Sequence, residues 1–408
     1  MRDNTAAGGE SLDHGTERAD ILAMIRDFVD RDVAPNVSRY EHADEFPYPL
    51  VQTMKEIGLF GTTIPEEYGG LGLDLTTYAL IVKELSRGWI SLSGVLNTHF
   101  ITSFMLTRFG TDEQKRELLP RMATGELRGA FSMTEPHAGS DVQAIRTRAV
   151  RDGDEYSITG QKMWVTNGLR AGLVMLLAVT DPAAEPRHRG MTAFIVLKEP
   201  EVAEMPGLTI PPPLRKLGYK GVESTELVFD GYRVPASRVL GGPGQESHGF
   251  AQFMAGIELG RVNIAARAIG IAVSAFENSI RYAQEREAFG KPIANHQQIQ
   301  VMLAQMATKI RAAELLMLDA AQMKDSGERA DLEAGMAKLF ATEIAEEVTI
   351  DAMRIHGGYG YSLEYPIERL YREAPLLMIG EGSNEIQQLI IARRLLERHC
   401  VSAGGPRS

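Results

Sequence analysis

The chain has 408 residues, of which 44% are hydrophobic and 24% are charged, a composition typical of a globular protein with two or three packed units. Its net charge of −11 argues against a general nucleic-acid-binding surface, because phosphate binding needs clustered Lys and Arg. The single cysteine, Cys400, excludes an intramolecular disulfide and a cysteine-based metal site, and we expect no metal.

The first residues are polar and rich in Gly, without the apolar core of a signal peptide. We therefore expect a disordered tail over residues 1–16. No apolar run approaches the roughly 18–20 residues that span a bilayer. These features indicate a cytoplasmic protein with neither a membrane nor a nucleic acid as partner.

Residues 17–128 have the periodicity of helices. Ile21, Ile25 and Phe28 recur at helical spacing, and Pro35 is expected to end this first helix. The segment PEEYGGLGLD at 65–74 predicts a loop, because Pro and Gly interrupt regular structure. We expect an N-terminal helical domain here.

The pattern changes near Gly129. Short β-rich runs (DEYSITG, KMWVTN, AGLVMLLAVT, MTAFIVLK and STELVFDGYRV) follow one another without long helices between them. This spacing predicts a small antiparallel barrel or sandwich over residues 129–240. Long apolar stripes and a helix ending near Gly357 and Gly358 then predict a four-helix-type bundle over residues 241–400. The fold class is α+β.

Two blocks in the β segment carry polar groups suited to a ligand. FSMTEPHAGSD at 131–141 is either a turn with a helix N-cap or a loop that offers N–H and hydroxyl donors. In GQKMWVTNG at 160–168, Trp164 and Thr166 lie two apart on a strand and share one face. A flat cofactor can stack there, although a strand Trp is more often part of the core.

Two further blocks lie in the helical C-terminal part. QEREAFGKPIANHQQIQ at 284–300 is, taken locally, a helix–helix connection. Glu381 lies in Gly380-Glu381-Gly382, directly before a helix with Ser383 as its N-cap. Glycines permit unusual backbone angles and the close approach of a ligand, although such turns are common. No GxGxxG or Walker sequence occurs, so a Rossmann nucleotide site is not supported.

Taken together, these blocks resemble the acyl-CoA dehydrogenase family from about residue 17 to 398. The resemblance is carried by PEEYGGLGLD, TEPHAGSD, GQKMWVTNG, RVPASRVLG, RxxFGKPI, HGGYGY and EGSNEIQ in this order. It implies the three-domain fold of that family, FAD as cofactor, and desaturation of an acyl-CoA to a trans-2-enoyl-CoA. It also implies an electron-transfer flavoprotein as acceptor and a homotetramer that is a dimer of dimers.

The resemblance assigns roles to individual residues. Glu381 is expected to be the general base, with Glu258 as the rival acid, because Gly260 stands where some relatives carry the base. The expected flavin contacts are Phe131, Met133, Thr134, Gly139, Ser140, Trp164, Thr166, Arg286, Phe289, Gln297, Arg354, Gly357, Gly358, Ser383 and Glu385. The expected substrate contacts are Ser140, Glu258, Arg261, Gly380 and Gly382.

The sequence departs from the family at Gly380, where many members have Tyr, and at Arg354, where Gln is usual. Loss of an aromatic ring at 380 suggests a wider acyl pocket. Two other functions agree less well with the sequence. Oxygen-using enzymes of this fold usually lack the Glu that follows the Gly, and a flavoprotein that binds nucleic acid conflicts with the acidic net charge of −11.

Overall fold

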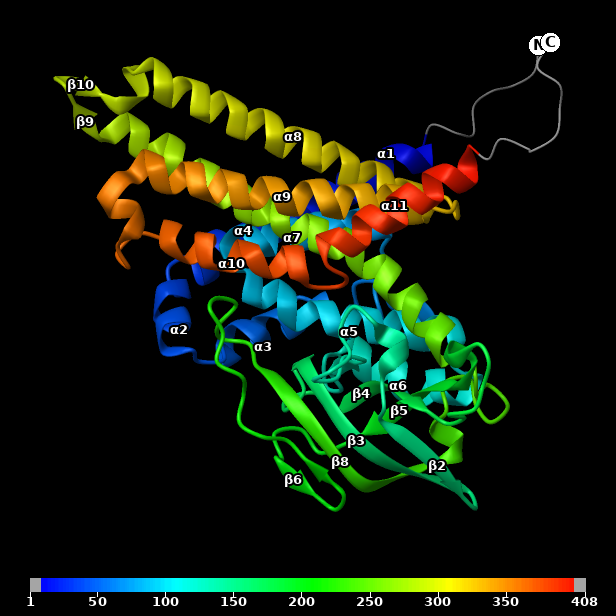
Figure 1. Ribbon diagram of the computed structural model, residues 1–408. Helices are drawn as coiled ribbons and strands as arrows, with labels where there is room; N and C mark the ends of the chain where they lie inside the picture. Colours follow the sequence, from blue (N-terminus) through cyan, green and yellow to red (C-terminus); the bar gives the residue numbers. More distant parts are fainter. Residues whose placement is uncertain (1–8, 400–408) are drawn as a thin grey trace, which may run out of the picture. The chain divides into compact units, whose positions relative to one another are not determined.

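The computed structural model describes residues 9–399, and the chain divides into two compact units, one ending at Ile257 and the other beginning at Glu258 (Figure 1). Of the tail predicted over residues 1–16, residues 1–8 lie outside the described part, and helix α1 begins at Gly9. The predicted order of helices, β unit and helical bundle is confirmed.

Helices make up the beginning of the first unit. The first helix continues as a π-helical turn, Val29–Val33, which stops two residues before Pro35, as the proline predicts. The segment at 65–74 is a loop with a short 3₁₀ turn, Glu66–Tyr68. The helices are α1 (Gly9–Phe28), α2 (Val37–Ala43), α3 (Tyr48–Glu56), α4 (Leu75–Gly88), α5 (Ile90–Phe109) and α6 (Asp112–Ala123).

One sheet forms the β part of the first unit, in the order β1-β4-β2-β3-β8-β7-β6, with β5 paired to β4. The strands are β1 (Gly129–Ser132), β2 (Arg148–Asp152), β3 (Glu155–Thr166), β4 (Leu173–Val179), β5 (Met191–Leu197), β6 (Glu204–Met205), β7 (Leu208–Thr209) and β8 (Ser224–Pro235). The pairings of β4 with β1 and β2 are parallel, so the sheet is mixed and not purely antiparallel as predicted. The runs DEYSITG and KMWVTN join into the single strand β3.

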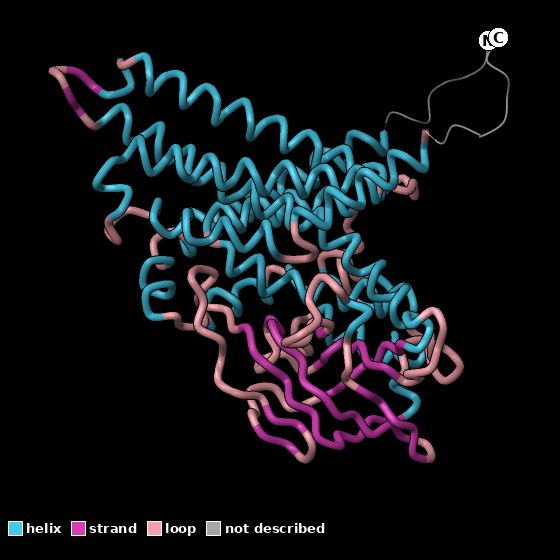
Figure 2. The backbone as a smooth tube through the Cα atoms, viewed as in Figure 1, coloured by secondary structure: helices cyan, strands magenta, loops and turns pink. Residues whose placement is uncertain are grey.

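The second unit is a helical bundle, and Figure 2 shows the hairpin β9–β10 at one end of it. Helix α9 packs against α8, α10 and α11, and its buried positions include the small residues Ala334, Ala337, Ala341 and Ala345. Small side chains let neighbouring helices approach closely. The elements are α7 (Gly249–Glu285, which begins in the first unit), β9 (Glu287–Ala288), β10 (Lys291–Pro292), α8 (Gln297–Asp325), α9 (Asp331–His356), α10 (Ile367–Ile379) and α11 (Asn384–Arg398).

Helix α7 is long and apolar enough to cross a membrane by length and composition alone. However, 83% of its most apolar window is buried inside the protein. Val262, Ala265 and Ile269, from the apolar stripe in its sequence, are fully buried. We conclude that α7 is a core helix.

A β-bulge shapes the strand that carries the predicted stacking residue. The pairing of β3 with β8 shifts register between Lys162 and Val165. Within this bulge Trp164 has φ +62°, and its side chain is 54% exposed, whereas Val165 is buried. The bulge thus turns a large aromatic ring outward.

A buried ion pair connects the same strand to the loop that follows β1. The fully buried Lys162 Nζ donates to the Met133 carbonyl at 2.8 Å and to Glu135 Oε1 at 2.9 Å. Burial lowers the pKa of Lys162 to about 8, although the Glu135 carboxylate opposes this shift. The backbone N–H of Met163 donates to the Thr134 carbonyl at 2.9 Å. Consecutive residues of β3 therefore hold residues 133–135 in place.

We predict that Lys162→Met destabilises the protein strongly, because it leaves the Glu135 carboxylate buried without its cation. Removing one partner of a buried pair costs about 3–5 kcal/mol. Urea denaturation measures the loss, with Lys309→Met as control, since Lys309 is a half-exposed lysine paired with Glu347 at 2.5 Å. Equal unfolding free energies for the two variants would contradict the prediction.

Candidate functional site

The predicted base lies in a strained turn between two helices of the second unit. Helix α10 ends at Ile379, and Ser383 is the N-cap of α11, as predicted. Between them Glu381 has φ +53° and Gly382 has φ +87°. The left-handed conformation costs a non-glycine residue about 1–2 kcal/mol, so surrounding contacts must maintain it.

The carboxylate of Glu381 lies against the backbone of Gly260 in α7. A β-carbon at Gly260 would be 1.6 Å from Glu381 Oε2, far inside van der Waals contact, and this oxygen is buried. The room for the carboxylate therefore exists only because residue 260 has no side chain. The structure brings these residues together across a long separation in sequence.

Two side chains, Lys338 and Gln387, hold the turn that carries Glu381. Lys338 Nζ donates to the carbonyls of Met378 and Gly382, at 3.1 and 2.9 Å, and to Asn384 Oδ1 at 2.7 Å. Gln387 Nε2 donates to the carbonyls of Glu381 and Gly382, both at 3.3 Å. Burial lowers the pKa of Lys338 to about 8, while Glu381 and Glu385 oppose the shift.

Two predicted substrate residues lie on α7 near this turn. Burial lowers the pKa of the Arg261 guanidinium, and the charges of Glu258, Asp331 and Glu381 oppose that shift. Among the described residues, Arg261 Nε is buried without a hydrogen-bond partner. Glu258 forms an ion pair with Lys324 of α8. Arg261 therefore retains a donor for a ligand, whereas the carboxylate of Glu258 is already neutralised.

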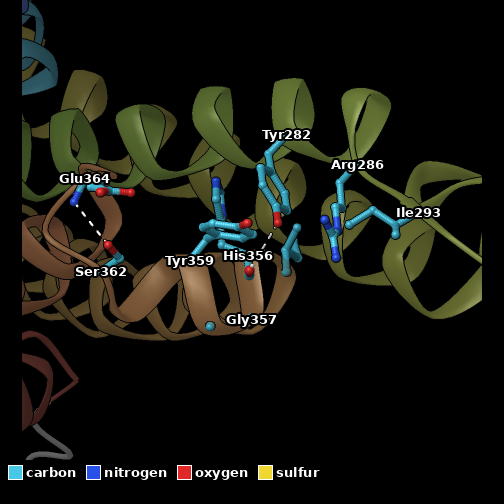
Figure 3. A pocket seen from close by; sticks show the side chains of 10 residues that line it. Tyr282, Arg286, Ile293, His356, Gly357, Tyr359, Ser362 and Glu364 are labelled. Atoms are coloured by element: carbon cyan, nitrogen blue, oxygen red, sulfur yellow. Dashed lines mark hydrogen bonds between the residues drawn. The ribbon is translucent and has the colours of Figure 1, made fainter.

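A second feature of the bundle is a cavity of about 510 Å³ (Figure 3). Tyr282 stacks on His356 with ring centroids 4.3 Å apart, and the Arg286 guanidinium lies 5.8 Å from the Tyr359 ring. The cavity is lined by Tyr282, Arg286, Ile293, Ile355, His356, Gly357, Gly358, Tyr359, Ser362 and Glu364. Guanidinium donors, aromatic faces and exposed glycine backbone suit a phosphate-bearing ligand with a flat ring.

The other predicted flavin residues of this unit do not line that cavity. Phe289, at the tip of the β9–β10 hairpin, is 96% exposed with φ +54°, and Gln297, the first residue of α8, is exposed. Arg354 forms an ion pair with Asp351 at 3.0 Å. Glu385 is exposed, and hydrogen bonds from its own backbone N–H and the Ser383 hydroxyl lower the pKa of its carboxyl. These groups are open to a ligand or to another chain.

The predicted flavin residues of the first unit lie on β1, on the loop after it and on β3. The Phe131 ring packs 4.6 Å from the Phe253 ring, and Gly139 and Ser140 are exposed. Met133 and Thr134 are half-buried, with the backbone fixed by Lys162 and Met163 as described above. Trp164 and Thr166 are both accessible to solvent. The alternative that Trp164 belongs to the core is therefore wrong.

Several residues of these sites were not predicted from the sequence. Lys338 and Lys162 are single lysines within apolar segments, and Tyr282 and His356 are single aromatic residues near helix ends. A lysine taken alone does not show whether its side chain is buried. The sequence signal for the two lysines is a charge at a position where the periodicity predicts burial.

Comparison with known proteins covers nearly the whole described chain. Sequence models of the N-terminal, middle and C-terminal domains of acyl-CoA dehydrogenases match residues 15–126, 130–232 and 247–396. An acyl-CoA dehydrogenase of Bacillus subtilis (strain 168) is 42% identical over 93% of this chain and 98% of its own length. The (2S)-methylsuccinyl-CoA dehydrogenase of Cereibacter sphaeroides is 41% identical over 97% of this chain and 73% of its own.

The fold matches solved structures equally well. A glutaryl-CoA dehydrogenase from Mycobacterium smegmatis, solved in complex with FADH2, superimposes with a TM-score of 0.86 at 31% identity, covering 93% of this chain and 95% of that one. The matched domains, the identity to the curated relatives and the shared fold together show that the chain belongs to the acyl-CoA dehydrogenase family of FAD-dependent oxidoreductases.

Proposed function

We propose that the chain desaturates an acyl-CoA thioester to a trans-2-enoyl-CoA, with Glu381 as the general base. The observation that carries the proposal is the position of the Glu381 carboxylate against the bare backbone of Gly260. A carboxylate in a strained, glycine-flanked turn with a buried oxygen is well placed to meet a ligand.

The chemistry requires such a base. The α-proton of a thioester is weakly acidic, so the base must be positioned, and the enolate oxygen that develops must receive hydrogen bonds. We assign the backbone N–H of Glu381 to that oxygen. FAD, when bound, accepts the β-hydride, which no side chain can do. A site that excludes water strengthens the carboxylate as a base.

The residues present fit FAD in each unit. In the first unit the outward-facing Trp164 ring offers a stacking surface, and Thr166 and the loop at 131–140 add polar groups and backbone. In the second unit Arg286, Gly357 and Gly358 line a cavity that suits a diphosphate. We assign Phe289, Gln297, Arg354, Ser383 and Glu385 to flavin contacts as well.

The rival base is less suited to the reaction. The carboxylate of Glu258 is already engaged in an ion pair with Lys324. We assign Glu258 instead, with Ser140, Arg261, Gly380 and Gly382, to contacts with the acyl-CoA. Arg261 supports this role, because its buried Nε has no partner among the described residues.

We further propose an electron-transfer flavoprotein as acceptor, a cytoplasmic location, and a homotetramer built as a dimer of dimers. The tetramer is supported by apolar side chains exposed on two helices of the bundle. They are Val301 and Leu315 of α8 and Leu389 and Leu396 of α11.

We predict that Glu381→Gln retains FAD but loses flavin reduction by about 10²–10⁴-fold, because the amide cannot accept the α-proton. The purified protein is titrated anaerobically with straight, branched and aromatic acyl-CoAs while the visible flavin band is recorded. Bleaching of the wild type by one class identifies the substrate. Wild-type activity in the variant would sink the assignment of the base. In a separate aerobic assay, oxygen consumption by a protein that no acyl-CoA bleaches would favour an oxygen-using enzyme.

A second prediction concerns Gly260→Ala. The new β-carbon would occupy the place of Glu381 Oε2, so the carboxylate must turn away. Misplacement by about 1 Å can cost about 10²-fold in rate, and we expect a loss of this order with FAD retained. The matched control is Gly335→Ala in α9, where the nearest atom to a new β-carbon is Ile391 Cγ1 at 3.3 Å. Equal rates for both variants would contradict the role of Gly260.

A third prediction concerns Gly380→Tyr. Gly380 has φ −69° and ψ 150°, which any residue adopts, and a β-carbon there would approach only the Leu376 carbonyl, at 3.3 Å. The backbone therefore does not require glycine, and we infer that the space serves a branched or cyclic acyl chain. The variant is expected to shift the kcat/KM ratio by about tenfold toward straight chains. An unchanged ratio would count against a role for Gly380 in selecting the substrate.

A further inference from the structure

Lys338 is a charged residue in the centre of the second unit that the reaction itself does not use. Its side chain is fully buried on α9 and is surrounded by the ends of the turn that carries Glu381. Its ammonium donates to Met378 at the end of α10, to Gly382 inside the turn and to Asn384 at the start of α11. One ammonium thus satisfies acceptors before and after Glu381 in the chain.

These contacts belong to a small network. Thr342, one helical turn after Lys338, donates to the same Asn384 Oδ1 at 3.1 Å. Gln387 Nε2 donates to the Glu381 and Gly382 carbonyls, both at 3.3 Å. An ammonium has three donors and no acceptor, and all three are used here. Without the Lys338 ammonium, the carbonyls of Met378 and Gly382 lose a charged hydrogen-bond donor in a partly buried site.

The turn needs this support. Glu381 has φ +53°, a conformation that a non-glycine side chain adopts only when its surroundings hold it. Relaxation of the turn would move the carboxylate away from Gly260. We propose that Lys338 is the positioning residue that keeps the Glu381 turn in the conformation that presents the carboxylate to the substrate, a role that rests on the proposed function of Glu381 as base.

The charges around Lys338 support the same role. Burial lowers the pKa of Lys338 to about 8; Glu381, Glu385 and Glu343 oppose this shift, and Arg261 adds to it. Below this pH the ammonium is charged and serves each acceptor. As the pH rises through about 8, the amine keeps only two donors and no charge. The turn is then held less firmly.

The test compares Lys338→Met and Lys338→Arg with the control Lys309→Met, which removes a half-exposed lysine of the same bundle. In Lys338→Met we expect the rate of flavin reduction by acyl-CoA to fall about 10²-fold, with KM within about threefold of wild type and FAD retained. Backbone amides of residues 380–387 should exchange with deuterium faster, even without substrate. The control should show neither change.

The pH dependence of the rate tests the proposal even if Lys338→Met does not fold. The wild-type rate should fall as the pH rises through about 8, whereas Lys338→Arg, which stays charged, should lose this alkaline limb. Wild-type rates and amide exchange in Lys338→Met, or the same alkaline limb in Lys338→Arg, would overturn the proposal. Failure of every acyl-CoA to bleach the wild-type flavin would instead refute the proposed function itself.

Discussion

The candidate site depends on the close approach between the Glu381 carboxylate and the backbone of Gly260. Helix α7 can present bare backbone to the turn only at a glycine, because a β-carbon would lie 1.6 Å from Glu381 Oε2. The requirement is reciprocal, since the carboxylate reaches this place only if Glu381 and Gly382 adopt positive φ values of 53° and 87°. The glycine at position 260 of α7 and the strained turn after α10 are therefore two parts of the same arrangement.

In each unit a buried lysine holds a loop of the candidate site by hydrogen bonds. In the first unit Lys162 donates to the Met133 carbonyl and to Glu135, and in the second Lys338 donates to the Met378 and Gly382 carbonyls and to Asn384. A buried ammonium is costly, but several acceptors around it offset much of that cost. Such a cluster is rigid because any displacement of the loop leaves a charged group unsatisfied. The two loops to which we assign ligand contacts are thereby held in one conformation.

The sequence predicted the local features of the site better than its distant contacts. The left-handed backbone at Gly382 and the N-cap position of Ser383 follow from local sequence, and the structure has both, although the Ser383 side chain makes no capping hydrogen bond. The outward turn of Trp164 depends on a register shift between β3 and β8, which strand periodicity does not encode. The contact of Gly260 with Glu381 and the burial of Lys338 depend on how α7, α9 and α10 pack, so only the whole fold reveals them.

Three glycines lie close to Glu381, the proposed base, and they are glycine for different physical reasons. The comparison identifies residue 380 as the position that can change. Gly382 is required by its φ of +87°, and Gly260 is required by the carboxylate that lies against it. Gly380 has an ordinary backbone conformation, and a β-carbon there would approach only the Leu376 carbonyl, at 3.3 Å. A glycine at position 380 loses more conformational entropy on folding than another residue would, and its backbone angles do not require it. In the proposed site, residue 380 is thus the position next to Glu381 where we expect a side chain to change the acyl pocket while the contact of Glu381 with Gly260 is kept.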